Sequence, residues 1–190
     1  MTLTVGIDEV GRGCWAGPLV AAAVLLVEPI EGLRDSKKLS AKRRAAFAEQ
    51  IYNSSASVGI GWVTPVEVDS LGLTKAVQLA MLRAIKRIDC DYDEIIIDGN
   101  LNFFQNVIGL KTENIKTLIR ADDLIPAVSA ASIVAKVARD NRMAELAVEY
   151  PGYGFESHVG YGTAAHIAAL QKLGVCDIHR KSYKPIRALL

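Results

Sequence analysis

The stretch Thr2-Leu-Thr-Val-Gly-Ile-Asp-Glu-Val-Gly-Arg-Gly13 sets the interpretation of the whole chain. A short apolar run ends at two adjacent acids, Asp8 and Glu9, and a glycine-rich turn follows at once. Acids at the end of an apolar strand are costly to bury unless positive charge lies among them. The stretch therefore predicts a strand over residues 3–8, with a catalytic or cation-binding site at its carboxyl end.

Two more acids follow apolar runs farther along the chain. Asp98 ends Glu94-Ile-Ile-Ile97, and Asp122 follows Ile115-Lys-Thr-Leu-Ile-Arg120. If these strands are neighbours, their ends gather several carboxylates, and a hard cation such as Mg²⁺ or Mn²⁺ is the natural occupant. Metal-assisted phosphodiester chemistry is the leading interpretation, although an acid after a strand is often only a helix N-cap or a turn residue. Without metal, at least one of these carboxyl pKa values should be raised.

The adjacency of Asp8 and Glu9 poses a geometric problem. Neighbours in a regular strand point to opposite faces of the sheet. Both can serve one site only if the strand ends or twists there, or if Glu9 acts through its main chain or a water. The turn at Gly11 favours a strand end.

The rest of the pattern predicts one α/β domain, with a mixed sheet and helices packed on it. Ligands of such sheets bind beyond strand ends. Further strands are expected at 18–27, 56–63, 94–97 and 115–119. Helices are expected at 41–52 after a Ser40 cap, from Pro65 after a Thr64 cap, from Gly72 to about Ile88, at 126–149, and at 164–173 after Thr163.

Composition bounds the classes of protein that fit. The 190 residues suit one domain, and 51% of them are hydrophobic, which is enough for a core. The formal charge of +1 requires any nucleic-acid surface to concentrate its Lys and Arg locally. Three separated cysteines without a CxxC pair argue against a zinc site or a disulfide framework and fit a reducing cytoplasm. We expect no signal peptide and no membrane span.

Three short stretches are candidates for substrate contact. In Gly11-Arg12-Gly13, the glycines allow a close backbone approach and the forked Arg12 cation can clamp phosphate and sugar, unless this is a tight turn with a solvated arginine. The loop Asp35-Ser-Lys-Lys38 can contact a phosphate backbone or be a solvated turn. Tyr161, between glycines and ahead of a helix, can stack on a sugar or base or pack over the helix start.

Two other chemistries are disfavoured. His158, His166 and His179 share no metal-type spacing, so each is expected to be a surface or core histidine. Ser132 lacks a nucleophile elbow and evident His–Asp partners, which excludes a serine hydrolase.

In these stretches the chain resembles ribonuclease HII, the type 2 ribonuclease H family. The related type 3 enzymes lack the Gly-Arg-Gly turn. The matching stretches run in the family's order from one end of the chain to the other: Gly6–Gly13 with Ala16-Gly-Pro18, Asp35–Leu39, Asp98-Gly-Asn100, Ala121-Asp122 with Ser129–Asp140, Gly160–Thr163, and His179-Arg180.

The resemblance implies a ribonuclease H-like fold, with a five-stranded mixed sheet flanked by helices and a C-terminal helical extension. Residues 1–190 would form one catalytic domain, and residues from about 150 to 190 would contact the substrate. The implied catalytic and metal-binding set is Asp8, Glu9, Asp98 and Asp122. Asp123 stands where a small residue is common, but the match over Ser129–Lys136 favours Asp122.

The resemblance also assigns the substrate contacts. Gly11, Arg12 and Gly13 would recognise the 2′-OH at the junction between ribonucleotide and DNA, Tyr161 would stack on the following deoxyribose, and Lys37 would touch phosphate. Cys14-Trp15 departs from the usual family residues, and residues 174–179 match only loosely.

The implied activity is cleavage of RNA in RNA–DNA hybrids and incision 5′ to single ribonucleotides in duplex DNA. Two Mn²⁺ or Mg²⁺ ions would assist, and the products would carry 3′-OH and 5′-phosphate ends. The role would be ribonucleotide removal and primer processing, by a cytoplasmic monomer without an evident sliding-clamp motif. Two alternatives stay open: another two-metal nuclease or integrase-like enzyme, and a nucleic-acid binding module whose acid cluster is vestigial.

Overall fold

The computed structural model describes residues 2–33, 39–105, 107–111 and 114–190. Within them, one five-stranded sheet has the order β3-β2-β1-β4-β5. The β1–β2 and β2–β3 pairs are antiparallel, and the β1–β4 and β4–β5 pairs are parallel. This confirms the predicted mixed sheet. The strands are β1 Thr4–Val10, β2 Leu19–Leu26, β3 Ser55–Val63, β4 Glu94–Asp98 and β5 Ile115–Leu118.

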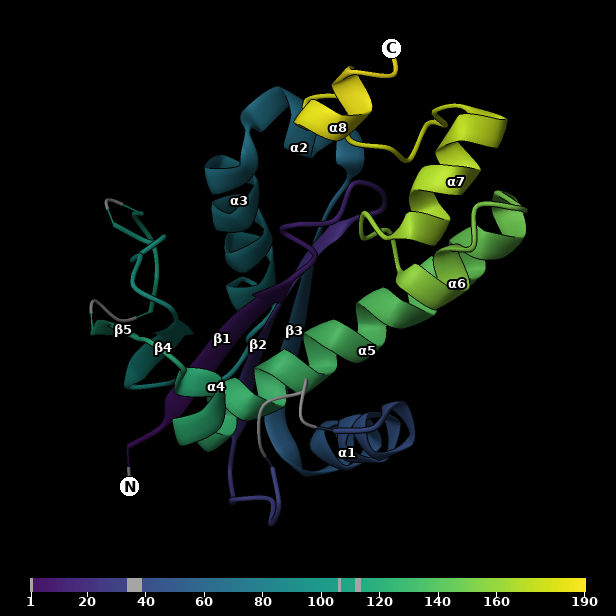
Figure 1. Cartoon of the computed structure of the whole chain (residues 1–190). Coiled ribbons are helices and arrows are strands. Elements are labelled where there is room, and N and C mark those ends of the chain that lie inside the picture. Colours follow the sequence, from purple (N-terminus) through teal and green to yellow (C-terminus); the bar gives the residue numbers. More distant parts are fainter. Residues whose placement is uncertain (1, 34–38, 106, 112–113) are drawn as a thin grey trace.

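Helices flank the sheet and continue past one end of it (Figure 1). The predicted helices at 126–149 and 164–173 are confirmed residue for residue. The helix predicted to reach Ile88 ends at Ile85, because a tighter turn follows in which the Arg87 N–H bonds to the Ala84 carbonyl. The helices are α1 Ala41–Ser54, α2 Pro65–Leu71, α3 Leu73–Ile85, α4 Ala121–Leu124, α5 Pro126–Glu149, α6 Phe155–His158, α7 Ala164–Leu173 and α8 Lys184–Arg187.

The predicted N-caps hold three helix starts. The Ser40 hydroxyl accepts from the Arg43 N–H, and the Thr163 hydroxyl accepts from the His166 N–H. Thr64 and Glu67 form a reciprocal capping box at the start of α2, with Pro65 at the first helical position. Each cap satisfies N–H groups that a helix start leaves without a partner.

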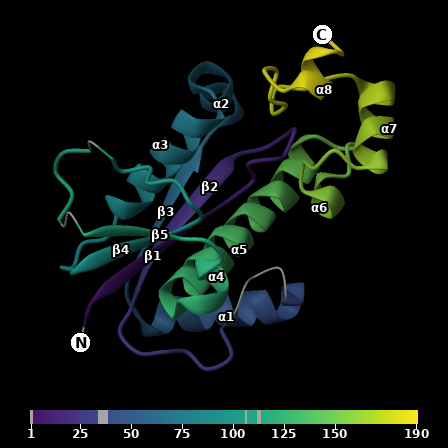
Figure 2. The ribbon, with the colours of Figure 1, turned by 60° about the vertical axis from the view of Figure 1, so that its left-hand side comes forward.

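The two faces of the sheet bury different helices, as the turned view also shows (Figure 2). Alternate strand residues such as Val5, Ile7 and Ile95 pack with α3 in one core cluster. The opposite face of β2, with Ala22 and Val24, packs with α1 and α5 in a second cluster. Strand β2 is buried on both faces, which explains why its sequence is a continuous apolar run.

Helix α5 approaches β1 unusually closely. A Cβ atom added at Gly6 would lie 2.2 Å from the backbone carbonyl carbon of Ala127, so only glycine fits there. The buried side of α5 carries small residues that permit the same approach along its length: Ala127, Ser129, Ala130, Ala131, Ser132 and Ala135.

The chain after α5 forms the expected C-terminal helical extension. Helices α6 and α7 and the residues around them bury a third cluster, in which Tyr153, Phe155 and Leu170 pack against Met143 of α5 and Ala16. Among the described residues, no helix is long and apolar enough to cross a membrane.

The close contact at Gly6 yields a stability prediction. We expect Gly6→Ala to lower the free energy of unfolding by about 1–3 kcal/mol or more, because the added methyl group forces α5 away from β1. Urea denaturation followed by circular dichroism measures this. Glu49→Ala, at an exposed position of α1, is the control and should stay within about 0.5 kcal/mol. Equal stability of the two variants would contradict the packing argument.

Candidate active site

Asp8 and Asp98 lie side by side on neighbouring strands. The parallel pairing of β1 with β4 aligns Ile7 with Ile97, and the two aspartates are the next residues along each strand. Strand alternation places both on the face of the sheet that packs against α4 and α5. The main chain orients both: the Glu9 N–H donates to Asp8 Oδ1 at 2.7 Å, and the Ala121 N–H donates to Asp98 Oδ1 at 2.8 Å.

The expectation that the strand ends at Asp8 is wrong. Strand β1 continues to Val10, because its antiparallel pairing with β2 runs on through Glu9 and Val10 after the β4 pairing has stopped. Alternation therefore turns the Glu9 side chain toward the other face, where its Oε1 lies 3.1 Å from Arg12 Nη1. Its charge nevertheless acts on Asp8.

Asp122 lies in the short helix α4, directly after the residue whose N–H bonds Asp98. The bond from the Ala121 N–H to Asp98 fixes the start of that helix, and the Ser129 hydroxyl donates to the Asp122 carbonyl at 2.6 Å. The Asp122 side chain is buried, whereas Asp123 Oδ2 is bonded to Arg120 Nη2 at 2.9 Å. The geometry favours Asp122 over Asp123 as the partner of Asp98.

The electrostatics of the site centre on Asp8. Burial raises its pKa to about 8, and the negative charges of Glu9 and Asp98 act in the same direction, while a hydrogen bond with Ser132 opposes them. A carboxyl group held this way gains most from a cation placed beside it. The expectation of a raised carboxyl pKa is confirmed at this residue.

The protein alone does not form a closed metal cage. Among the described residues, no three His, Cys, Asp or Glu side chains converge closely enough to hold an ion by themselves. Magnesium is usually bound through only one or two carboxylates, with water and substrate phosphate completing its shell. Asp8 and Asp98, which share a face and carry only oxygen donors, fit such an open site.

The glycine-rich turn after β1 lies against Tyr161. Gly11 has a φ of +93°, and a Cβ there would meet Arg139 Nε at 2.5 Å, so the turn requires glycine. A Cβ on Gly13 would sit 3.9 Å from Tyr161 Cε1. The Tyr161 side chain is partly exposed, as stacking on a substrate would need. Lys37 and the rest of the predicted 35–38 contact lie outside the described residues.

Two buried arginines, whose role the sequence did not reveal, donate hydrogen bonds to main-chain carbonyls in and just after this turn. Arg139 of α5 donates to the Pro18 and Ala16 carbonyls at 2.9 and 3.2 Å. Arg180 donates to the Arg12 carbonyl at 3.1 Å and to the Gly17 carbonyl at 3.0 and 3.2 Å. Their distance in sequence from the turn hides this role, although a buried arginine whose bonds go mostly to main-chain carbonyls supports the backbone around it.

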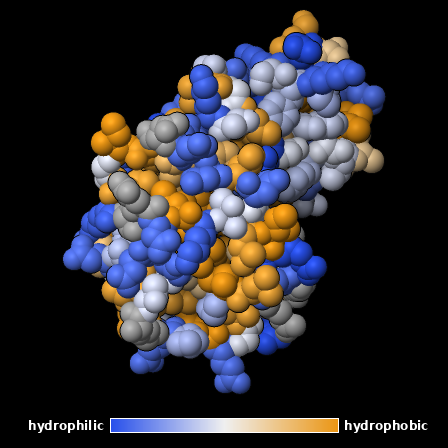
Figure 3. Space-filling view, turned by 90° about the vertical axis from the view of Figure 1, so that its left-hand side faces the viewer, coloured by the Kyte–Doolittle hydropathy of each residue, from blue (hydrophilic) through white to orange (hydrophobic). Residues whose placement is uncertain are grey.

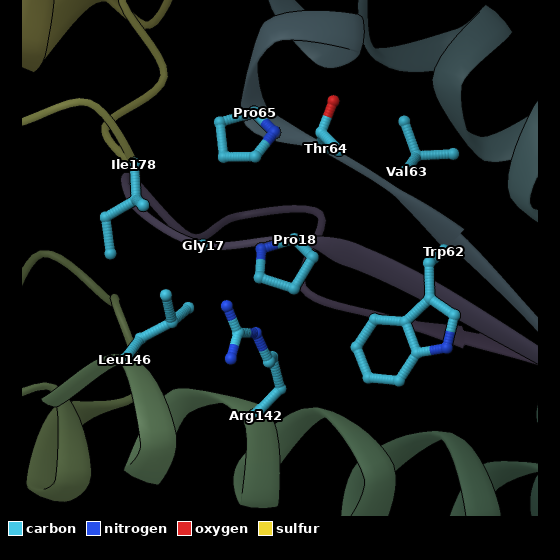
Figure 4. A pocket seen from close by; sticks show the side chains of 9 residues that line it. All are labelled: Gly17, Pro18, Trp62, Val63, Thr64, Pro65, Arg142, Leu146 and Ile178. Carbon is cyan, nitrogen blue, oxygen red and sulfur yellow. The ribbon is translucent and has the colours of Figure 1, made fainter. Parts of the chain in front are cut away.

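A pocket of about 350 Å³ between the ends of β2 and β3 and helix α5 has a mainly apolar lining (Figure 4), in which Arg142 is the one charged residue. This pocket offers none of the carboxylates found at Asp8 and Asp98. The face that carries β4, β5 and α4 mixes hydrophilic and hydrophobic side chains (Figure 3), with Ile119 and Leu124 exposed.

A family comparison agrees with this arrangement of acids and turn. The family model of ribonuclease HII matches residues 5–186, which is nearly the whole chain. The chain belongs to the ribonuclease HII family. Ribonuclease HII of Shewanella halifaxensis is 47% identical over 187 residues, covering 97% of this chain and 89% of that protein.

Solved structures of similar proteins share the fold. Ribonuclease HII of Archaeoglobus fulgidus, solved in complex with PCNA, superposes with a TM-score of 0.82 at 25% identity, covering 96% of this chain and 95% of that one. Bst-RNase HIII in complex with Mn²⁺ gives a TM-score of 0.73 at 18% identity, covering 98% of this chain and 68% of that one. These likenesses confirm the ribonuclease H-like fold.

Membership of ribonuclease HII makes the protein a ribonuclease H, a nuclease that acts on RNA–DNA hybrids. Enzymes of this family depend on divalent metal ions. The predictions of family, fold and enzyme class are thus confirmed, whereas the roles of the individual site residues stay predictions.

The raised pKa of Asp8 predicts an unusual pH dependence of stability. Between pH 3.8 and about 8 the folded protein keeps a proton that the unfolded chain releases, so the stability from Asp8 is full at low pH and lost as the pH rises toward 8. Asp8→Asn removes this loss. In EDTA, we expect its advantage over the wild type to grow by on the order of 2 kcal/mol between pH 5 and pH 8.

Urea denaturation at the two pH values measures the difference. Asp91→Asn is the control, because that side chain is fully exposed and should change stability little at either pH. An Asp8→Asn curve parallel to the wild-type curve would refute the electrostatic assignment.

Proposed function

We propose that the protein incises the strand 5′ to ribonucleotides embedded in duplex DNA and cleaves the RNA strand of hybrids, leaving 3′-OH and 5′-phosphate ends. The acidic set would be Asp8, Glu9, Asp98 and Asp122. The single observation that carries the proposal is the buried Asp8 beside Asp98, whose raised pKa marks a place prepared for positive charge.

Divalent cations fit this donor set, which offers only hard oxygen ligands. Asp8 and Asp98 would hold two Mn²⁺ or Mg²⁺ ions, with Asp122 and Glu9 or its main chain contributing from either side. When bound, such ions supply an activated water and stabilise the charge on the leaving 3′ oxygen. The Mn²⁺ complex of Bst-RNase HIII supports this assignment by analogy.

The chain's own groups would orient the acids and the phosphate. The Glu9 N–H and Ser132 fix one carboxylate, and the Ala121 N–H fixes the other, so each keeps one rotamer without metal. Arg12 already neutralises Glu9 and exposes about half of its side chain, so its fork can also meet a phosphate.

Selectivity would come from the 2′-OH, the group that distinguishes RNA from DNA locally. Gly11 and Gly13 carry no side chain to block a sugar, and main-chain N–H groups of the turn would bond a hydroxyl. The Tyr161 ring beside Gly13 would stack on the following deoxyribose, and residues from about 150 to 190 would act as the substrate-contacting extension. Lys37 would contact phosphate.

Nucleic acid is the partner that we propose for this chain, as a monomer. The Archaeoglobus relative was solved with PCNA, but Pro185–Leu190 offers no aromatic anchor for a sliding clamp. The three free cysteines fit a reducing cytoplasm.

Incubation with a DNA duplex that contains one ribonucleotide tests the proposal, with Mg²⁺, Mn²⁺ or EDTA present and the cut mapped. We expect a metal-dependent cut 5′ to the ribonucleotide. Asp8→Asn should lower kcat roughly 100-fold or more, since several kcal/mol of transition-state stabilisation is lost, while duplex binding stays near the wild-type value.

Asp91→Asn is the matched control and should cut normally. Undiminished Mg²⁺-dependent activity of Asp8→Asn would refute the catalytic assignment. Equally fast cutting of all-DNA duplex would indicate a different two-metal nuclease, and binding without any cleavage would indicate a binding module.

Arg12→Ala tests the junction contact. We expect it to reduce kcat/KM on the single-ribonucleotide duplex about tenfold more than on a continuous hybrid, because one charge-assisted hydrogen bond at the junction is lost. Arg12→Lys keeps the positive charge but lacks the two-pronged guanidinium group, so its selectivity for the junction should lie between those of the wild type and Arg12→Ala. Equal losses of Arg12→Ala on both substrates would count against the assigned role.

A further inference from the structure

Three histidines lie buried together beneath the Gly160–Gly162 turn. His158 belongs to α6, His166 to the first turn of α7, and His179 to the segment before α8. The rings of His158 and His166 stack with their centroids 4.4 Å apart, and those of His166 and His179 are 5.2 Å apart. Such a buried polar cluster is stable only if its members satisfy one another.

Their hydrogen bonds fix one set of neutral tautomers. His166 Nδ1 lies 2.9 Å from the Tyr161 carbonyl oxygen, so Nδ1 carries the proton and Nε2 is free to accept. His179 Nε2, 3.0 Å from His166 Nε2, must then donate to it. This leaves His179 Nδ1 as the acceptor of the Cys176 N–H at 3.0 Å. The relay runs from Cys176 through both rings to Tyr161.

The hydrogen bond between His166 and His179 connects two segments, one around residues 160–166 and one around residues 176–180. Both segments contact the chain at Trp15 and Ala16, just after the Gly11–Gly13 turn. On one side, the Gly160 carbonyl accepts from the Trp15 N–H at 2.8 Å, and Gly162 packs so tightly on the Trp15 ring that a Cβ would clash with it. On the other side, the Arg180 N–H donates to the Trp15 carbonyl at 2.7 Å, and His179 is bridged to Ala16.

We propose that His166 and His179 are positioning residues, whose hydrogen-bonded neutral pair holds these two segments at the separation that sets Tyr161 over Gly13 for the substrate. The proposal rests on the proposed function, in which Tyr161 and the Gly11–Gly13 turn contact the nucleic acid.

Protonation would break the relay. A proton on His166 Nε2 would face the His179 N–H. A proton on His179 Nδ1 would face the Cys176 N–H, with the Cys176 carbonyl at 3.2 Å and the Cys176 Sγ at 3.1 Å as the nearby acceptors. Burial is the main cause that lowers the pKa of both, that of His179 to about 4. In the folded protein the relay is therefore intact at neutral pH and is lost as the pH falls through about 4.

Several other groups face the His166–His179 pair. His158 faces it from α6, the Tyr153 ring lies 5.4 Å from the His179 ring, and the Cys176 Sγ lies 3.1 Å from His179 Nδ1. Asp177 acts on Cys176, and the Arg180 guanidinium points away to the Gly17 carbonyl.

Three variants of His166 test the proposal at pH 8 on the single-ribonucleotide duplex. His166→Ala removes both bonds of the ring, so KM should rise about tenfold with kcat within about threefold of wild type. His166→Asn keeps a donor near the Tyr161 carbonyl but loses the bond from His179, so it should stay impaired. His166→Gln keeps an acceptor for His179 but loses Tyr161, and should stay impaired.

Tyr153→Phe is the matched control from the same cluster. It deletes a hydroxyl that bonds the Gly174 carbonyl at 3.0 Å, with no bond to the Gly160–Gly162 turn, so it should lower the melting temperature but leave KM unchanged. Should His166→Ala not fold, the Asn and Gln variants, which each keep one of the two bonds, decide the question, because a wild-type KM in the Asn variant would show that the bond to His179 is not needed.

A second readout is the pH dependence of selectivity. Between pH 7 and pH 4 in EDTA, the affinity of the wild type for the ribonucleotide duplex relative to all-DNA duplex should fall, whereas His166→Asn should show a flatter profile. An unchanged KM in His166→Ala, a wild-type KM in His166→Asn, or identical pH profiles would each overturn the proposal. If the wild type cuts neither substrate, the proposed function fails instead.

Discussion

The close contact between β1 and α5 is the constraint on which the site depends. Gly6 has no side chain, so the backbone of α5 can lie directly against β1 there. The small residues of α5 allow the helix to stay close to the strand past Asp8. Ser132 can then bond the carboxyl group, and water is excluded from one side of it. A larger residue on either surface would hydrate Asp8 and return its pKa toward that of a free aspartate.

Some of this could be predicted from sequence, where a local pattern reflects a local structure. The periodicity and small residues of 126–149 defined α5, and the capping residues located the starts of three helices correctly. The acids after apolar runs located the strand ends at Asp98 and near Asp122. Specific motifs identified the family.

Other features depend on tertiary partners and left no local signal. The extra length of β1 comes from its pairing with β2, so the position of Gly11 could not reveal it. The one-turn helix α4 is too short to show periodicity, although it buries Asp122 and leaves Asp123 bonded to Arg120. The histidines were expected to lie on the surface or in the core without a role, because 13 residues separate the two rings that bond each other.

The Gly11–Gly13 turn near the start of the chain is completed by residues near its end. The Arg12 carbonyl accepts from both Arg180 and the Tyr183 hydroxyl, and the Gly17 N–H donates to the Ile178 carbonyl. During translation, β1 and its acids leave the ribosome long before these supports are synthesised. A nascent chain therefore carries Asp8 and Glu9 before the residues that support the Gly11–Gly13 turn have been made, so this turn takes its final form only after every strand of the sheet has been synthesised.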